Sequence, residues 1–278
     1  MRATWDALAA ADTELVVGDP GRGEEELAAL FGRLGVDPRG GVCVEVGCGP
    51  GRMTGALAER FDRVIAVDVS PAMLARAREA VAAPGVEFRA VAGDRLDSVE
   101  DAVADVAVCY LVLQHLPSVR HVIVYLLELA RVLRPGGEAF VQLPVLERGL
   151  RPRLWRLLRS AAVPVAERLG RDPLVRAAFR GTRVTRDELD GALADGRLDV
   201  VAEDVGPDAP YRHSRDVFLR LRRPGASSRR RSTRRSSSPR SSSSGAGRCS
   251  PSTRSSSASR CTTSSWRCST RRGSAARR

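Results

Sequence analysis

The sequence predicts a doubly wound α/β domain followed by a segment without a fold. Short apolar runs alternate with helical stretches from residue 23 to residue 143, and strands joined through helices form a parallel sheet covered on both faces. Residues 223–278 contain no Val, Leu, Ile, Phe, Met or Tyr, and 20 Ser and 15 Arg fill 35 of their 56 positions. A segment of this composition can bury too little apolar surface to compensate for the conformational entropy that it would lose on folding. We therefore expect a domain over 1–222 and a disordered tail over 223–278.

The domain divides into elements that follow one another closely. A helix is predicted over 23–35, where four apolar residues have helical spacing and three glutamates occupy the first turn. Strands are expected at 42–46, 64–67, 86–91, 106–111 and 138–143, and helices at 53–61, 71–82, 96–103 and 119–133, with a turn over 134–137. After an insertion at 145–184, a helix over 185–194 and strands over 198–205 and 216–221 complete the domain. The last strand is a candidate for antiparallel pairing with its neighbour.

The charge is distributed unevenly. The 278 residues carry 45 basic and 33 acidic side chains, a net charge of +12. Because the tail holds 15 Arg and no acid, residues 1–222 carry 30 basic and 33 acidic residues and a net charge of −3. All the basic residues are Arg. The lack of lysine excludes a Schiff-base lysine, a P-loop lysine, the protein-kinase strand lysine and the Tyr-x-x-x-Lys pair of dehydrogenases.

Apolar runs and cysteines indicate a cytoplasmic protein. The longest apolar run, 106–113, falls far short of the ~20 residues that cross a bilayer. Asp6 and Asp12 interrupt the stretch in which a signal peptide would be apolar. Three of the six cysteines lie in strand-like segments, and the other three lie in the tail without metal-site spacing or a nearby histidine. We expect free thiols and no metal site.

A glycine-rich turn after the first strand carries the functional signal. The segment 42–52 reads VCVEVGCGPGR, a buried strand that runs into Gly47, Gly49 and Gly51 before a helix. Glycines admit positive φ and leave room for a ligand, and ligands of open α/β sheets bind beyond the carboxyl ends of the strands. Arg52 stands where the dinucleotide fingerprint has its third glycine, and Glu45 would repel a pyrophosphate but suit a cationic amine. The turn therefore predicts a cofactor site for a cation.

At this point the sequence resembles the class I S-adenosylmethionine-dependent methyltransferases. The likeness rests on five motifs, which are Glu45–Gly51, Asp68 in VIAVDVSPAML, Gly93-Asp94, LQHLP over 113–117 and LRPGGE over 133–138. These motifs cover roughly residues 40–145, with a weaker likeness to about residue 222, and their joint order is more specific than a lone glycine motif. The resemblance implies a Rossmann-like methyltransferase fold, S-adenosyl-L-methionine as cofactor and a small-molecule acceptor.

The resemblance also assigns cofactor-binding roles. It places the methionine part of the cofactor against Gly47, Gly49 and Gly51, with Glu45 at the ammonium group. It gives the ribose hydroxyls to Asp68, the adenine face to Met73 and the adenine amino group to Asp94. Cys48, Val69, Arg95 and Tyr110 are expected to complete this set. Asp68 and Asp94 could instead be helix or turn caps, Met73 could be core, and Tyr110 could simply pack.

Three residues are expected on the catalytic side, and Tyr110 and His115 are the candidates for a catalytic role. Tyr110 and Gln114 lie where the fourth strand opens toward the methyl group. A general base is needed only if the nucleophile arrives protonated, and His115 is the best candidate because its pKa can be tuned near neutrality. The alternative is that His115 is a structural hydrogen-bonding residue.

The N-terminal segment and the insertion are expected to select the acceptor. Residues 148–186 contain 11 Arg against Glu167 and Asp172, a local charge of +9. Leucines and arginines interleave over 150–159 in a basic amphipathic helix. One hypothesis is a lid that favours an acidic or amphipathic acceptor, with contact to a lipid surface as a weaker option. The alternative is a helix that packs its leucines inward and its arginines toward water.

The tail and the overall function each have competing interpretations. An Arg/Ser segment could bind nucleic acid through phosphate contacts, but a shifted reading frame in GC-rich DNA would give the same composition, and we favour that frameshift product. A nucleic-acid-binding methyltransferase or noncatalytic binding protein is the main alternative, and an NAD(P) oxidoreductase is less favoured. Because the chain has CYLV at 109–112 and no Asn/Asp-Pro-Pro-Tyr element, methylation of nucleic-acid bases is not expected.

Overall fold

The computed structural model describes residues 2–10, 20–158, 182–206 and 213–225. The chain divides into two units, Met1–Arg234 and Arg235–Arg278, and all described residues belong to the first. The predicted disordered tail lies outside the described residues from position 226 onward.

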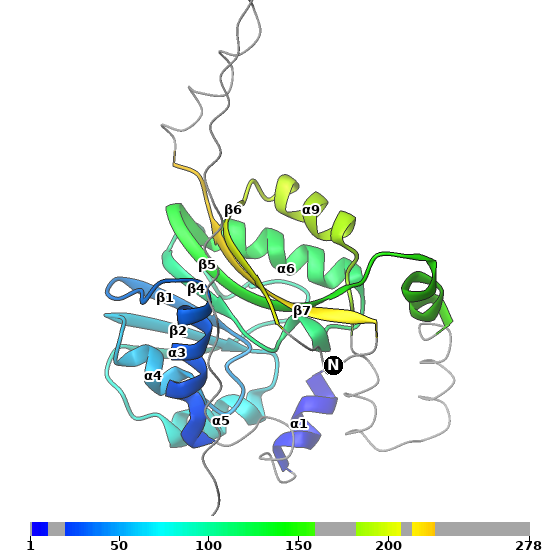
Figure 1. Cartoon of the computed structure of the whole chain (residues 1–278). Helices are drawn as coiled ribbons and strands as arrows, with labels where there is room; N and C mark the ends of the chain where they lie inside the picture. Colours follow the sequence, from blue (N-terminus) through cyan, green and yellow to red (C-terminus); the bar gives the residue numbers. More distant parts are fainter. Residues whose placement is uncertain (1, 11–19, 159–181, 207–212, 226–278) are drawn as a thin grey trace, which may run out of the picture. The chain divides into compact units, whose positions relative to one another are not determined.

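A seven-stranded sheet forms the centre of this unit, in the order β3-β2-β1-β4-β5-β7-β6 (Figure 1). Its strands are β1 (Val42–Val46), β2 (Arg63–Asp68), β3 (Val86–Ala90), β4 (Ala104–Cys109), β5 (Leu133–Leu146), β6 (Asp199–Val205) and β7 (Ser214–Arg222). The first five are parallel, whereas β7 pairs antiparallel with both β5 and β6. The predicted doubly wound, mostly parallel sheet and the antiparallel last strand are therefore confirmed.

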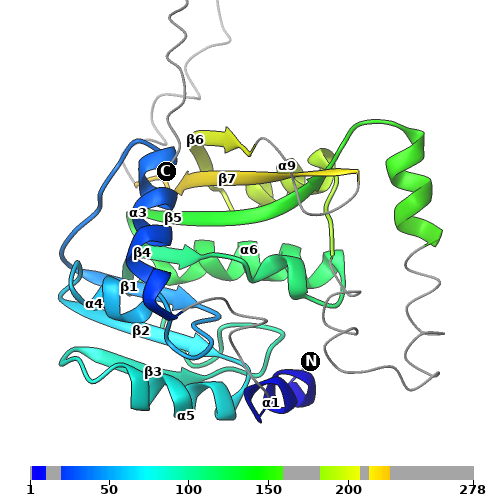
Figure 2. The same ribbon diagram turned by 60° about the horizontal axis from the view of Figure 1, so that its bottom comes forward.

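Helices cover both faces of the sheet. They are α1 (Arg2–Ala10), α3 (Gly23–Arg33), α4 (Thr54–Ala58), α5 (Pro71–Ala80), α6 (Val119–Val132) and α9 (Arg186–Asp195), with short 3-10 helices η1 (Pro20–Arg22) and η2 (Leu113–His115). Figures 1 and 2 show α3 and α4 on one face and α6 and α9 on the other. Alternate strand residues supply the two cores, as when Cys43 packs with α3 while Val44 packs with α6.

The turn at 134–137 is a bulge within β5. The register between β4 and β5 shifts after the Ala104–Leu133 pair and resumes at Val106–Glu138. Gly137 fits this bulge because an added Cβ would lie 2.9 Å from the carbonyl oxygen of Ala104. The bulge returns the chain to the sheet in register for the long β5–β7 pairing.

The helix expected at 96–103 is wrong, because residues 96–103 form turns. Side chains satisfy this backbone in place of helical hydrogen bonds. The Arg131 guanidinium donates to the carbonyl oxygens of Leu96 (2.8 Å) and Val99 (2.9 Å), and the Glu128 carboxylate accepts from the Leu96 amide at 2.8 Å. The buried Leu96 and Val99 side chains hold the segment against α6 without a helix.

The other predicted elements are present with altered ends, and the helix expected at 53–61 is the shorter α4. The helix α1 was not predicted. Residues 150–158 form a helix at the start of the insertion, and 159–181 lie outside the described residues. No helix in the described part of the chain is long and apolar enough to cross a membrane.

Candidate functional site

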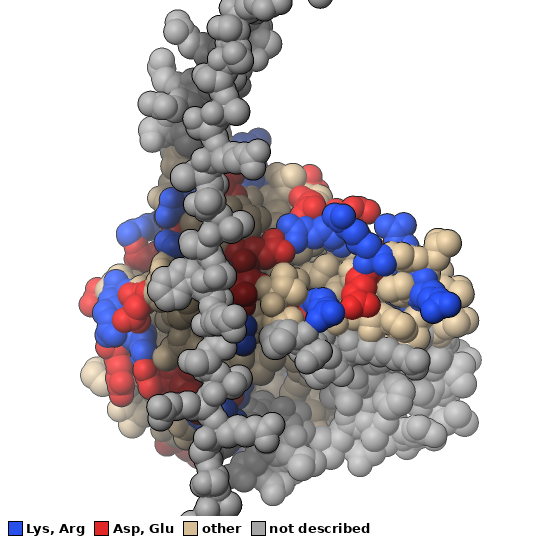
Figure 3. Space-filling model, in the orientation of Figure 1, with Lys and Arg blue, Asp and Glu red and all other residues tan. Residues whose placement is uncertain are grey.

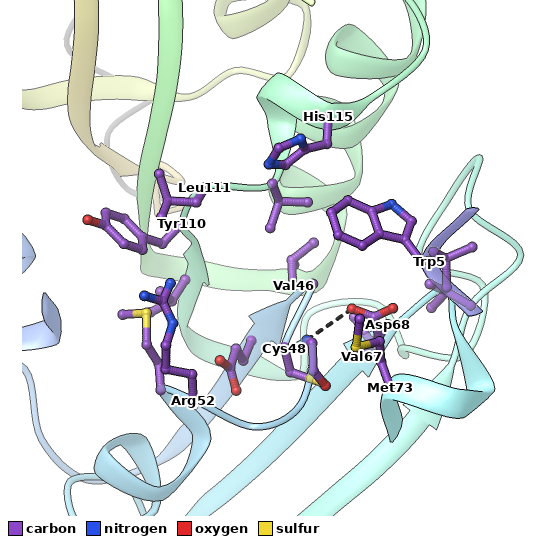
Figure 4. Close-up of a pocket in the computed structure, with 18 of the residues that line it drawn as sticks. Trp5, Val46, Cys48, Arg52, Val67, Asp68, Met73, Tyr110, Leu111 and His115 are labelled. Atoms are coloured by element: carbon purple, nitrogen blue, oxygen red, sulfur yellow. Dashed lines mark hydrogen bonds between the residues drawn. The ribbon is translucent and has the colours of Figure 1, made fainter. Parts of the chain in front are cut away.

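A cavity of about 370 Å³ opens at the carboxyl ends of β1, β2 and β4. Its size is within the range of small-molecule sites. One side is formed by the turn after β1 and the end of β2, and the other by the segment after β4 and by α1 (Figure 4). We call these the glycine side and the ring side.

The turn after β1 has the backbone that its glycines predict. Gly47, Gly49 and Gly51 have φ of 72°, 54° and 89°. An added Cβ on Gly47 would lie 2.4 Å from Val112 Cγ2, so this glycine allows the turn to contact the segment after β4. The amides of Gly47 and Cys48 donate to the carbonyl oxygen of Val67 at 2.8 and 3.0 Å, which ties the turn to β2.

Glu45 is buried beneath the turn. Its side chain is 5% exposed, and its Oε2 accepts a hydrogen bond from Thr54 Oγ1 at 2.6 Å. Burial raises the pKa of Glu45 to about 7, although the Thr54 hydroxyl opposes the shift. A carboxyl group with this pKa gives up its proton readily when a cation arrives, because the cation stabilises the charged form.

Asp68 ends β2 and carries the other carboxylate of the glycine side. Its Oδ2 accepts from the Gly49 amide at 3.0 Å, which Figure 4 shows, and its Oδ1 accepts from the Ser70 amide at 2.8 Å. Burial raises the pKa of Asp68, and the backbone hydrogen bonds oppose this. Each carboxylate oxygen keeps a further lone pair, so the group can also accept hydrogen bonds from a ligand.

The helix α1 closes the cavity over Asp68. Trp5 and Met73 line the cavity, and Met73 packs against Leu8 of α1. The Ser70 hydroxyl donates to Asp6 Oδ1 at 2.6 Å and accepts from the Met73 amide at 3.1 Å. This bridge fixes α1 to the start of α5.

The segment after β4 forms the ring side and is held in a strained turn. Leu111 has φ of 58°, which is rare for a branched side chain. Its amide donates to Gln142 Oε1 at 3.1 Å, and Gln142 Nε2 donates to Asp216 Oδ1 at 2.9 Å. Residues of β5 and β7 therefore determine how Tyr110 and Leu111 face the cavity.

His115 faces Trp5 across the ring side, with the ring centroids 5.3 Å apart and nearly perpendicular. Burial lowers the pKa of His115 to about 4. One ring nitrogen, Nε2, lies 3.2 Å from Gln114 Nε2, and the buried Nδ1 has no hydrogen-bond partner among the described residues. A neutral imidazole with a free nitrogen suits hydrogen bonding to a ligand, and its low pKa makes it a weak base.

Comparisons with known proteins find methyltransferases among the proteins that this chain resembles. A family model described as a methyltransferase domain matches residues 44–141. The trans-aconitate 2-methyltransferase of Azoarcus sp. strain BH72 is 38% identical over 142 residues, which are 50% of this chain and 52% of that protein. The ubiquinone biosynthesis O-methyltransferase of Methylococcus capsulatus is 29% identical over 171 residues, 59% of this chain and 65% of that protein. The chain thus matches between about half and two thirds of the length of these relatives.

Solved structures share the fold. The magnesium protoporphyrin IX methyltransferase of Synechocystis PCC 6803 with bound SAH superposes with a TM-score of 0.54 at 15% identity, over 80% of this chain and 97% of that one. Geranyl diphosphate methyltransferase in complex with SAM superposes with a TM-score of 0.52 at 18% identity, over 78% of this chain and 95% of that one. Residues 44–141 form a methyltransferase domain, and the whole described unit has the fold of these solved methyltransferases.

Most of the predicted site residues of the methyltransferase domain meet in the cavity. They are Glu45, Gly47, Cys48, Gly49, Asp68, Val69, Met73, Tyr110 and His115. Gly51 does not line it and instead faces α5, where an added Cβ would lie 3.3 Å from the Cα of Ala77. It permits close packing of the turn on the helix.

Asp94 and Arg95 lie outside the cavity lining. Their side chains are 63% and 66% exposed and approach each other at 4.0 Å. The nearest lining residue along the chain is Val91, where β3 has just ended. Their cofactor-binding roles remain predictions that this geometry does not support.

Several lining residues of the methyltransferase domain were not among those predicted. Trp5 could have been found, since Trp5, Leu8 and Ala9 have helical spacing. Arg52 lines the cavity and pairs with Glu26 at 2.6 Å, with both side chains largely buried. No local pattern indicates this pairing, because 26 positions separate the two residues.

The described part of the insertion lies away from the cavity. None of residues 146–158 lines it, so the lid hypothesis stays a prediction. The alternative with leucines packed inward is wrong for Leu150, Leu154, Leu157 and Leu158, all of which are exposed.

Proposed function

We propose that this protein transfers a methyl group from S-adenosyl-L-methionine to a small-molecule acceptor. The observation that carries the proposal is the meeting of two carboxylates, the buried Glu45 and the half-buried Asp68, with the positive-φ turn Gly47–Gly49 in one cavity. A zwitterionic cofactor with an ammonium group, a sulfonium and two ribose hydroxyls matches this set. The cofactor, when bound, supplies a methyl group on a positively charged sulfur.

The residues of the glycine side fit such a cofactor. Glu45 would hold the ammonium group. Burial disfavours the charged form of this carboxyl, and a neighbouring cation would stabilise that form. Asp68 would accept the ribose hydroxyls with the lone pairs that the Gly49 and Ser70 amides leave free. Met73, 1% exposed and part of the lining, would contact the adenine with its polarizable sulfur.

The residues of the ring side would orient the acceptor. Tyr110, Trp5 and Leu116 offer apolar surface, and Gln114 and His115 offer polar atoms. Most of the catalysis would come from alignment, because transfer needs a near in-line approach. With a pKa of about 4, His115 would serve as a hydrogen-bonding group rather than as the main general base.

Of the acidic and amphipathic acceptors expected from the sequence, we favour an amphipathic one. Arg52 is the one arginine in the described lining, and Glu26 neutralises it at 2.6 Å. An anionic acceptor would therefore find no uncompensated arginine there. An acceptor with a ring or apolar chain and one polar group matches the lining better.

The test is cofactor binding followed by transfer. S-adenosylmethionine should raise the melting temperature, and NAD(P) should not. Purified protein with methyl-labelled cofactor should then label a component of a metabolite extract, and Asp68→Asn should abolish the labelling. Stabilisation by NAD(P), or labelling of RNA alone, would support one of the alternatives, which no feature of the described residues favours. Cytoplasmic localisation also remains a proposal, to be tested by cell fractionation.

A further inference from the structure

The start of the insertion presents apolar side chains to solvent. We call residues 148–158 the basic arm. Its leucines lie at positions 150, 154, 157 and 158, a spacing that places them on one face of a helix. They are 84%, 58%, 66% and 64% exposed, and they make up four of the seven large apolar side chains that are exposed in the described part of the chain.

The opposite face of the basic arm packs on the domain. Pro152 is buried, and the guanidinium of Arg183 lies 4.6 Å from the Trp155 ring centroid. Arg156 donates to both oxygens of Glu188, at 2.7 and 3.0 Å. The polarity is therefore inverted with respect to an ordinary surface helix, which buries its leucines. Figures 1 and 2 show this helix apart from those that cover the sheet.

Arginines border the leucine face. At ~100° per residue, Arg151 and Arg153 fall on its two edges. Arg153 pairs with Asp187 at 3.2 Å, whereas Arg148 and Arg151 have no acidic partner among the described residues. The basic arm itself contains no Asp or Glu. In Figure 3, basic and uncharged side chains lie at the edge of the molecule that carries this helix in Figure 1.

We infer that the basic arm binds an anionic lipid surface. The leucine face enters the boundary between headgroups and acyl chains, and Arg148 and Arg151 contact lipid phosphates. An exposed apolar stripe flanked by unpaired cations is the arrangement of interfacial helices. The charge of these two arginines favours a lipid of negative charge. This inference does not depend on the proposed methyl transfer, because binding is measured without turnover.

The first test is co-sedimentation of the full chain with phosphatidylglycerol vesicles and with phosphatidylcholine vesicles. Because the arginine-rich tail also attracts anionic vesicles, binding is compared at about 0.5 M salt, where charge interactions are strongly screened. We expect the double variant L154S/L158S to lose at least about tenfold in partition coefficient, since two leucines no longer enter the lipid. Val201→Ser, at a residue of β6 that is 41% exposed, is the control and should bind like the wild type.

The second test addresses charge and depth. At low salt Arg151→Gln should weaken binding to phosphatidylglycerol about fivefold, the effect of one arginine near an anionic surface. Arg39→Gln changes the net charge equally at a surface pair with Asp37 and should have a smaller effect. Brominated lipid should quench the added fluorescence of L154W and not that of V201W.

Three results would overturn the inference. L154S/L158S could bind vesicles like the wild type. It could lower the melting temperature by several degrees, which would mean that the leucines are packed within the chain. It could also convert a lipid-free dimer to a monomer in sedimentation velocity, which would assign the leucine face to a second copy.

Discussion

The two sides of the cavity are made in different ways. The glycine side consists of one short stretch of chain and the strand beside it, and its polar groups are the carboxylates of Glu45 and Asp68 and the backbone amides. The ring side brings together α1, the turn after β4 and, behind them, Gln142 and Asp216 of β5 and β7. On the proposed function, the side that would hold the cofactor is built from one short stretch and a neighbouring strand end, whereas the side that would face the acceptor draws on segments from the whole domain.

Gly47→Ala should have the largest effect, because this residue joins the two sides. Its φ of 72° is unfavourable for alanine, and the new Cβ would lie 2.4 Å from Val112 Cγ2. We expect a loss of about 2–5 kcal/mol in the free energy of unfolding, measured by urea denaturation. Gly35→Ala is the matched control, since Gly35 has φ of 69° and no atom within 4 Å of the added Cβ. An equal loss in both variants would show that Val112 does not matter.

Asp68→Asn should weaken S-adenosylmethionine binding by about 100-fold in calorimetry, through the loss of charged hydrogen bonds to the ribose hydroxyls. The amide is nearly isosteric, so the fold should survive. Unchanged affinity would move the ribose away from the end of β2 and would contradict the assignment of the glycine side.

The pH dependence of stability should separate the two sides. The pKa of Glu45 is raised to about 7 from 4.5, so the folded protein keeps a proton that the unfolded chain has lost. The free energy of unfolding therefore falls as the pH rises through this window, by up to about 3 kcal/mol. The pKa of His115 is lowered to about 4 from 6.5, so its contribution falls as the pH drops through that window. The two slopes oppose each other between pH 4.5 and 6.5.

Single variants should separate the contributions of Glu45 and His115 to the pH dependence of the free energy of unfolding. Glu45→Gln should be more stable than the wild type at pH 8 and equal to it near pH 4, whereas His115→Asn should gain stability relative to the wild type as the pH falls below 6.5. Urea denaturation at several pH values provides the measurement. Glu79→Gln, at an exposed carboxylate of α5, is the control for Glu45→Gln. A pH-independent difference for Glu45→Gln would mean that the carboxyl is not the titrating group.

Asp94→Asn should have the smallest effect. Its side chain is 63% exposed and outside the cavity lining, so we expect a change in cofactor affinity of less than about threefold. A loss as large as that of Asp68→Asn would show that the loop after β3 moves onto the cofactor.

Local patterns account for what could be predicted. Glu45 and Asp68 follow from a buried strand, a glycine turn and a second strand end, and the alternation of elements predicts the sheet. Gln142 and Asp216 act on Leu111 from 31 and 105 positions away, and nothing near Leu111 in the sequence indicates them. The helix expected at 96–103 was wrong for the same reason, since its backbone partners are on α6.

The guanidinium of Arg131 uses all five of its N–H groups, on Leu96, Val99, Asp101 and both oxygens of Glu128. An ammonium group has three donors and no plane, so a lysine could not hold this loop. The Glu128 carboxylate raises the pKa of Arg131 above its already high value. Because Arg131 keeps its charge at alkaline pH, its hydrogen bonds to the 96–101 loop should persist where a lysine would lose its proton. Reagents that acylate amines have no lysine here to modify.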